Sequence, residues 1–171
     1  MSKASSGLFS NTKGALYSRE PNLKDPRGIK VISRIKVMYW AENKRNELTG
    51  KAKKNFNTAA VVYDESTGMY YYGRNGGYHE KGYVRNPILF GNDVHKGLLP
   101  TSSLNNYPVG NCAEVDAFNR ALKAGAKLSN LHLTTVHVTK NRFGEYKPSC
   151  ENCTYAFKGR IKKNYSGWVD K

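Results

Sequence analysis

Three cysteines, Cys112, Cys150 and Cys153, constrain the fold of this chain more than any other feature. Because three is an odd number, a set of disulfides would leave one cysteine over. A shared metal ion would use all three thiolates, and this requires the chain around Cys112 to fold against the other two. Such thiolates also imply that the protein works in a reducing compartment.

The stretch from Cys112 to Gly125 predicts a helix, because its apolar residues follow helical spacing until the glycine offers an end. Glu114 lies in the first turn of this helix. The β-branched residues 131–139 that follow predict a buried strand. A last short strand is expected at residues 165–170.

A second helix is expected to carry Cys150 and Cys153, with Ser149 as its N-cap. Two residues three apart in a first helical turn face the same way, and the helix dipole favours their thiolate forms. If the intervening strand lets the two helix starts converge, the three sulfurs form one site. Glu114 would then lie near the metal without ligating it.

The remaining pattern indicates one domain preceded by a tail. Residues 1–28 are rich in Ser, Gly, Asn, Lys and Pro and are expected to be a flexible tail or linker, leaving residues 29–171 as the domain. Residues 29–48 favour a helix. Residues 56–72 predict a β-hairpin around the turn DESTG, and residues 74–111 form a long excursion with little regular pattern.

The formal net charge of +15 indicates a polyanionic or acidic partner. No apolar run approaches the length of about 20 residues that a membrane span needs, and we expect no membrane partner. A free-nucleoside enzyme needs no such charge. Nucleic acid is therefore the expected ligand, and DNA is favoured over RNA.

Two motifs and a hairpin carry a resemblance to a known family. The sequence CAE at Cys112 and, after Pro148, the sequence CENC at Cys150 resemble the zinc signature of the cytidine deaminase superfamily. The stretch NFNTAAVVYDESTGMYYYGRN is similar to that superfamily's first hairpin. GNCAEVDAF and the basic charge look most like the YwqJ-like deaminase domains at the carboxyl ends of bacterial polymorphic toxins. The resemblance covers about residues 56–157.

The resemblance implies an α/β fold of the cytidine-deaminase-like type, a three-layer sandwich in which a hairpin and further strands are flanked by helices, with a shortened C-terminal end. It implies that Zn²⁺ is the cofactor. The family pattern makes Glu114 the catalytic proton shuttle. It assigns the metal ligands to Cys112, Cys150 and Cys153.

Substrate contacts are expected at four further residues, Asn75, Ala113, Phe56 and His95. The resemblance implies that Asn75 hydrogen-bonds the sugar of the substrate. Asn75 also suits a turn, because Gly76 and Gly77 follow it. Exposed loop histidines are common, so His95 could equally be a surface residue with no role in binding.

The expected function is hydrolytic deamination of bases in nucleic acid, with cytosine to uracil in DNA favoured over RNA or adenine deamination. The resemblance implies a bacterial toxin, secreted or delivered by contact, that acts in the cytoplasm of the recipient cell. A cognate acidic immunity protein is the expected partner, and the domain is expected to be a monomer.

The alternative of another class is a non-catalytic nucleic-acid-binding module stapled by structural zinc. Such a site would recruit a fourth ligand, for which His132 and His137 are the candidates. These two histidines fall on opposite faces of the predicted strand, so each suits a packed or edge position better than a ligand. A carboxylate at Glu114 is not needed in a structural site.

Overall fold

A mixed five-stranded sheet forms the middle layer of the protein, which is described by a computed structural model over residues 17–19 and 24–169. The strands are β1 (Tyr17–Arg19), β2 (Thr58–Asp64), β3 (Met69–Arg74), β4 (Leu131–His137) and β5 (Lys163–Asn164). Their order is β1-β3-β2-β4-β5. All pairings are antiparallel except that of β4 with β5, which is parallel.

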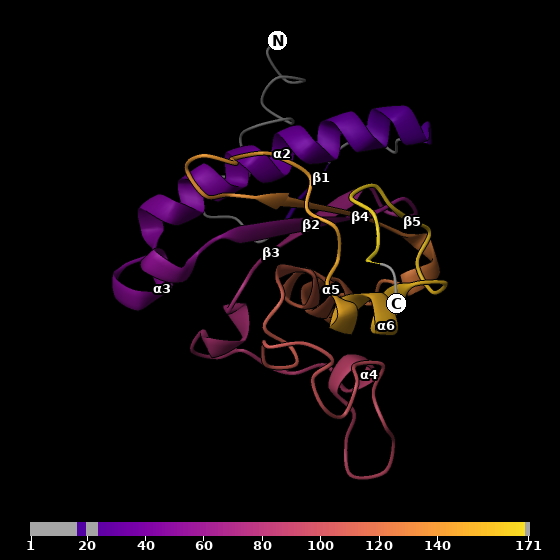
Figure 1. Cartoon of the computed structure of the whole chain (residues 1–171). Helices are drawn as coiled ribbons and strands as arrows, with labels where there is room; N and C mark the ends of the chain where they lie inside the picture. The colour runs from indigo at the N-terminus through magenta and orange to yellow at the C-terminus, as the bar shows by residue number, and fades with distance from the viewer. Residues whose placement is uncertain (1–16, 20–23, 170–171) are drawn as a thin grey trace.

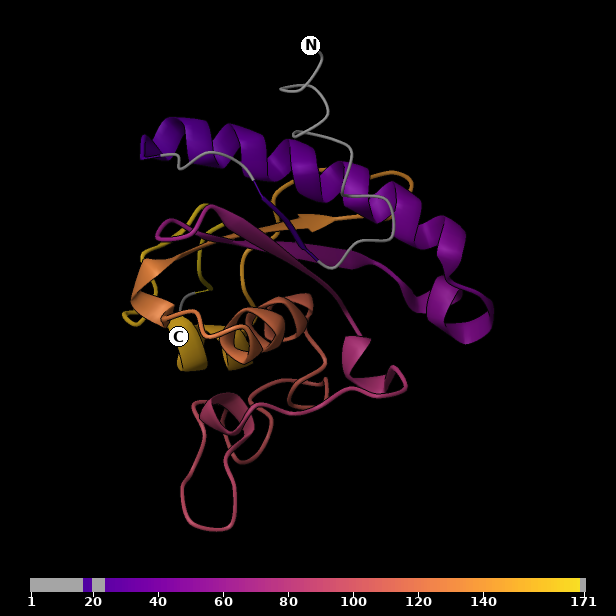
Figure 2. The ribbon, with the colours of Figure 1, turned by 180° about the vertical axis from the view of Figure 1, so that it is seen from behind.

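Helices cover both faces of the sheet, so the α/β class expected from the sequence is confirmed (Figures 1 and 2). α2 crosses one face, and α5 and α6 lie on the other. The helices are α2 (Pro26–Glu47), α3 (Gly50–Asn55), α4 (Pro87–Phe90), α5 (Ala113–Lys123) and α6 (Glu151–Phe157), with 3-10 turns η1 (Gly77–His79) and η2 (Leu128–Asn130).

The predicted hairpin is formed by β2 and β3. Asp64 ends β2, and its backbone oxygen accepts a hydrogen bond of 2.8 Å from the backbone N–H of Gly68, which has the positive φ that this turn requires. All seven residues of β2 are buried. Its side chains alternate, with Ala60 and Val62 in the core under α5, and Val61 in the core under α2.

The predicted helix at 29–48 is confirmed, but α2 begins earlier, at Pro26. Asp25 is its N-cap, since its carboxylate accepts a hydrogen bond of 2.9 Å from the backbone N–H of Arg27. The expected tail also differs at Tyr17–Arg19, which pairs with β3 as an edge strand. Residues 1–16 and 20–23 of that tail lie outside the described residues.

Helix α5 packs directly on β3 because Gly73 has no side chain. A Cβ at this glycine would lie 2.4 Å from both the Ala113 backbone oxygen and the Ala117 backbone nitrogen. The backbone of β3 therefore fixes the height of α5 above the sheet. The first turn of α5, which follows Cys112, is held at this contact.

The C-terminal elements differ in detail from the expectation. Cys150, not Ser149, takes the N-cap position of α6, and its side chain makes no capping hydrogen bond. The expected strand at 165–170 lies earlier, at β5, because Gly167 turns the chain with a φ of +90°. Trp168 makes only an isolated parallel bridge with Ser149.

No helix among the described residues combines the length and the apolar character that crossing a bilayer demands.

Candidate metal centre

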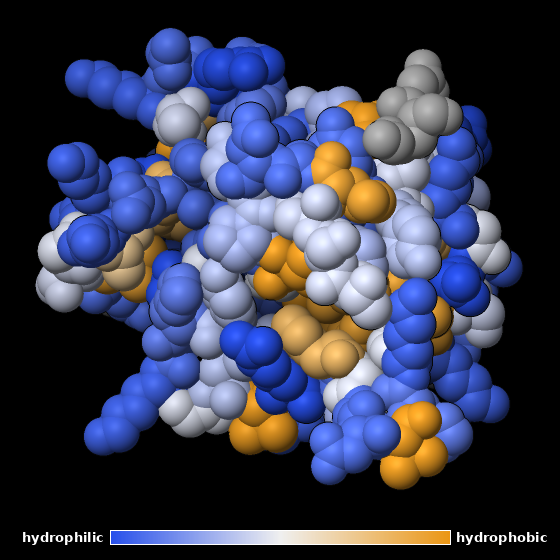
Figure 3. All heavy atoms as spheres, turned by 60° about the horizontal axis from the view of Figure 1, so that its bottom comes forward, coloured by the Kyte–Doolittle hydropathy of each residue, from blue (hydrophilic) through white to orange (hydrophobic). Residues whose placement is uncertain are grey.

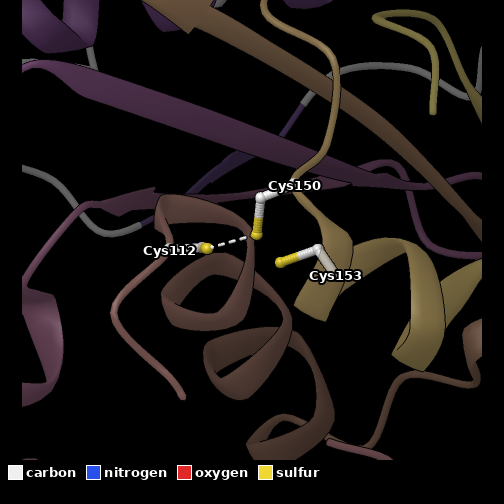
Figure 4. Close-up of side chains that lie close together, drawn as sticks. All are labelled: Cys112, Cys150 and Cys153. Atoms are coloured by element: carbon white, nitrogen blue, oxygen red, sulfur yellow. Dashed lines mark hydrogen bonds between the residues drawn. The ribbon is translucent and has the colours of Figure 1, made fainter. Parts of the chain in front are cut away.

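The three cysteine side chains converge between the starts of α5 and α6 (Figure 4). Cys112 is the N-cap residue of α5, Cys150 is the N-cap residue of α6, and Cys153 lies in the first turn of α6. Their sulfur atoms all lie within 4.8 Å of one another. The predicted convergence of the two helix starts is confirmed.

The three sulfurs lie close enough together to share a metal ion, but those of Cys112 and Cys150 would have to separate by about 0.9 Å to reach tetrahedral spacing. Zn–S bonds of about 2.3 Å place the sulfurs of such a site about 3.8 Å apart. The sulfurs of Cys112 and Cys150 are 2.9 Å apart, well beyond the length of about 2.05 Å for a disulfide bond. Within the described residues, no histidine or carboxylate completes the group to four, so a metal bound here would keep one position for water or substrate.

Neither candidate for a fourth ligand belongs to the cysteine group. The ring of His132 contacts Glu65 through Nε2 at 2.7 Å and the hydroxyl of Tyr165 through Nδ1 at 2.9 Å. Both ring nitrogens are thus engaged away from the cysteines. His137 is half-buried at the end of β4.

The three thiols share their protons unequally. Hydrogen bonds from Cys112 and Cys153 lower the pKa of Cys150, and the backbone N–H groups of Cys153 and Asn152 add to this effect. The hydrogen bond to Cys150 raises the pKa of Cys112, and hydrogen bonds to Cys112 and Cys150, together with burial, raise the pKa of Cys153. The first thiolate therefore forms at Cys150, and a bound cation would favour the other two.

Glu114 is buried beside this group, with only 3% of its surface exposed. Burial raises the pKa of Glu114 to about 7, and the negative charge of Cys150 adds to the increase. Lys147 and the hydroxyl of Ser149 oppose it, but they do not outweigh it. The side chain is consequently poised to bind and release a proton near neutral pH, as a general acid and base requires.

Two residues further along α5, a cluster of ion pairs surrounds Asp116. The Asp116 carboxylate lies 3.1 Å from the Arg120 guanidinium and accepts a hydrogen bond of 3.0 Å from the backbone N–H of Arg74. Glu80 completes the cluster through contacts with Arg74 at 2.9 Å, Arg120 at 3.4 Å and Lys44 at 3.5 Å. The sequence analysis did not predict this cluster.

Asn152, between Cys150 and Cys153, holds a loop against the cysteine group. Its side chain is 1% exposed. It accepts a hydrogen bond of 2.8 Å from the backbone N–H of Leu104 and donates one of 3.1 Å to the Ser103 hydroxyl. The sequence analysis missed this residue, although its place inside the CENC motif was the available signal.

Asn75 is engaged within the fold. Its side-chain oxygen accepts 3.0 Å hydrogen bonds from the backbone N–H groups of Asn57 and Thr58, and its amide donates one of 2.8 Å to the Asn55 carbonyl. These bonds tie α3 to the end of β3. The sugar contact expected of Asn75 stays a prediction. Ala113 lies between Cys112 and Glu114 with its side chain fully buried.

Phe56 and His95 are not brought together with the cysteines. Phe56 is 2% exposed and packs in the core on the α2 side of the sheet, because it follows α3 on that side. The cysteines belong to the core on the opposite side. His95 lies in an exposed segment that lines a separate pocket, which contains no cysteine. The structure gives no support for either as a substrate contact.

No protein-family model, no curated protein and no solved structure matches the chain. The candidate site is therefore defined by its own residues: three cysteines that could bind a metal ion, with a buried glutamate beside them.

Proposed function

We propose that this protein is a zinc-dependent hydrolytic deaminase of bases in nucleic acid, converting cytosine to uracil in DNA, with the fold of the cytidine deaminase superfamily. One observation carries the proposal. A buried carboxylate with a pKa near neutrality lies beside three convergent cysteines that have no fourth protein ligand among the described residues. A structural zinc site needs four protein ligands and no proton shuttle.

Cys112, Cys150 and Cys153 would hold the zinc ion. Thiolates suit this metal, and the ion would supply a water of lowered pKa, which provides the nucleophile near neutral pH. Because α5 and α6 each contribute their starts, the positive ends of both helix dipoles support the thiolates.

Glu114 would move the protons. In the reaction, water adds to the ring carbon that carries the amino group, and the C–N bond to that group then breaks. Glu114 would take a proton from the water and deliver it to the ring nitrogen, and would then take the proton of the hydroxyl group left on the ring carbon and pass it to the departing amine, which leaves as ammonia while that carbon becomes a carbonyl. Cytosine and water thereby give uracil and ammonia without another reactant.

The net charge of +15 supports a polynucleotide substrate, because a polyanion is concentrated by such a field. We further propose, on the resemblance to toxin deaminase domains, that the domain acts as a bacterial toxin, and the positive charge supports an acidic immunity protein as its partner. Electrostatic attraction would speed that association and make its rate depend on salt. Coexpression of the gene's downstream neighbour tests this, since a neutralising partner must suppress mutagenesis.

The decisive experiment incubates the zinc-loaded protein with single-stranded DNA that contains one cytosine, with matched RNA, and with DNA that contains adenine as the only deaminable base. Uracil, inosine and released ammonia are measured. We expect uracil in DNA, and a loss of about 100- to 10,000-fold in rate for Glu114→Gln, which should retain zinc. Tight DNA binding without ammonia from any substrate would instead identify a non-catalytic binding module.

A further inference from the structure

The pocket that His95 lines lies in the long segment between β3 and α5, on the side of the molecule where α4 lies. Figure 3 shows this side, on which hydrophilic side chains surround a hollow where apolar ones gather. The pocket has a volume of about 630 Å³. Its lining includes Arg85, Phe90, Lys96 and Val109, and none of the three cysteines or Glu114. It is thus separate from the metal centre.

Arg85 is the unusual residue of this pocket. Its guanidinium carbon lies 5.1 Å from the centre of the Phe90 ring and 5.6 Å from the centre of the Tyr78 ring. No carboxylate lies within ion-pair distance of it in the described part of the chain, whereas Arg74 and Arg120 both contact carboxylates. A guanidinium placed over aromatic rings spends none of its N–H donors on them, so these donors stay available to a ligand.

The charge of the pocket favours an anion. Lys96 supplies a second cation to the lining, and Asp93 supplies its carboxylate. Arg85 and Lys96 therefore outnumber Asp93, and the lining carries a net positive charge even with His95 neutral. A phosphate group matches the planar fork of donors that an arginine presents.

The pocket adjoins the metal centre through the chain that delivers Cys112. The Phe90 ring packs on Gly110, where an added Cβ would lie 2.9 Å from Phe90 Cε1. Val109 lines the pocket itself. Gly110 and Cys112 are two residues apart, so their Cα atoms are separated by no more than about 7 Å. This short chain separation is compatible with one polynucleotide strand that contacts both sites.

We propose that Arg85 binds a phosphodiester group of a single-stranded polynucleotide, next to the nucleotide whose base enters the metal centre. This inference rests on the proposed function and adds to it the chemical reason for preferring a strand over a free nucleoside. Phe90 and Tyr78 orient the guanidinium, and Lys96 contributes charge.

The test measures binding of the zinc-loaded protein to a fluorescent single-stranded DNA by anisotropy over a series of salt concentrations. Arg85→Ala should weaken binding several-fold at low salt and make the slope of log K against log salt less steep by about 0.7, the value for one phosphate contact on a single strand. Arg160→Ala is the matched control, because Arg160 is likewise exposed and has no carboxylate partner among the described residues. It should leave the slope unchanged.

Equal effects of Arg85→Ala and Arg160→Ala would overturn the inference, since the loss would then reflect net charge alone. A second measurement compares turnover of an oligonucleotide with that of free cytidine. Arg85→Ala should lower kcat/KM for the oligonucleotide and leave that for cytidine unchanged, and equal losses on both would also overturn it. If the unaltered protein deaminates neither, the proposed function fails, and the salt slope alone decides whether Arg85 binds phosphate.

Discussion

Helix α5 carries two buried carboxylates, Glu114 and Asp116, in surroundings of opposite charge balance. Asp116 is 1% exposed and lies against Arg120, and Glu80 nearby contacts both Arg74 and Arg120. Glu114 is 3% exposed and lies beside three sulfurs. The positive charge of Lys147 acts on Glu114, but it does not outweigh burial.

The difference in charge balance suits the Asp116 cluster to a structural role and the cysteine group to binding a ligand. The cluster around Asp116 is neutralised by the protein's own arginines, so it needs nothing from outside. The cysteine group and Glu114 together gather negative charge that Lys147 does not balance, and a divalent cation would balance it. The following experiments test this contrast, from the largest expected effect to the smallest.

Cys150→Ser should have the largest effect. The unaltered protein is expected to bind about one zinc per chain. Metal binding to thiolate sites is worth roughly 10–16 kcal/mol in small zinc domains, so losing one of three ligands should abolish stoichiometric zinc and lower the melting temperature. Metal analysis and thermal unfolding measure this. Asp116→Asn is the control that should keep its zinc. Full zinc occupancy in Cys150→Ser would contradict a metal site at the three cysteines.

Asp116→Asn should instead reduce the free energy of unfolding by about 1–3 kcal/mol, because it removes the ion pair with Arg120 and weakens the acceptor for the Arg74 N–H, while Arg120 keeps Glu80. Glu114→Gln should keep or increase stability, since burial already disfavours the ionised form of that carboxyl. Denaturant unfolding of the two variants compares the sites directly. The contrast fails if Glu114→Gln proves as destabilising as Asp116→Asn.

Asn152→Ala should destabilise the protein by about 1–3 kcal/mol, because two part-buried hydrogen bonds, with the Leu104 N–H and the Ser103 hydroxyl, are lost. Hydrogen exchange should show faster exchange in residues 103–107 and little change around Asp116. Asn105→Ala is the milder comparison, since Asn105 is more exposed and also bonds Glu151. Unaltered protection of residues 103–107 would show that Asn152 does not hold this loop.

The smallest effect is the acid dependence that Glu80 contributes. Burial favours a higher pKa, but hydrogen bonding to Arg74 and the charges of Lys44, Arg74 and Arg120 outweigh it and lower the pKa below its usual 4.5. A carboxyl with a lower pKa in the folded state contributes stability above its unfolded pKa and loses it as the pH falls through the folded value. Unfolding measured from pH 6 to pH 3 should therefore show a shallower decline for Glu80→Gln, and an identical decline would exclude this role.

Local sequence patterns predicted the elements that position the three cysteines. Residue spacing and turn residues predicted the hairpin, the buried strand and the helices after Cys112 and Cys150. A metal site shared by all three cysteines required the starts of the two helices to lie close together. The start of α2 was missed although Asp25 and Pro26 form a recognisable cap. Its signal was hidden by the polar composition of residues 1–28.

Partners distant in the sequence were not predictable. Asp116 meets the backbone of Arg74 across 42 positions, and Asn152 meets Leu104 across 48. Neither pair shares a local period or motif. Phe56 was assigned by its position at the hairpin entry, but which face of the sheet its side chain takes depends on how α3 joins β2.

The placement of Cys112 and Cys150 on separate helices has a consequence for how easily the protein unfolds. A metal ion at the three sulfurs would act as a cross-link between chain positions 38 residues apart and would enclose β4 within a closed loop. In the chain-entropy estimate, closing a loop of this length withdraws about 4 kcal/mol of conformational freedom from the unfolded chain. Metal-free chain would regain that freedom, so removing the metal should make the fold easier to unfold.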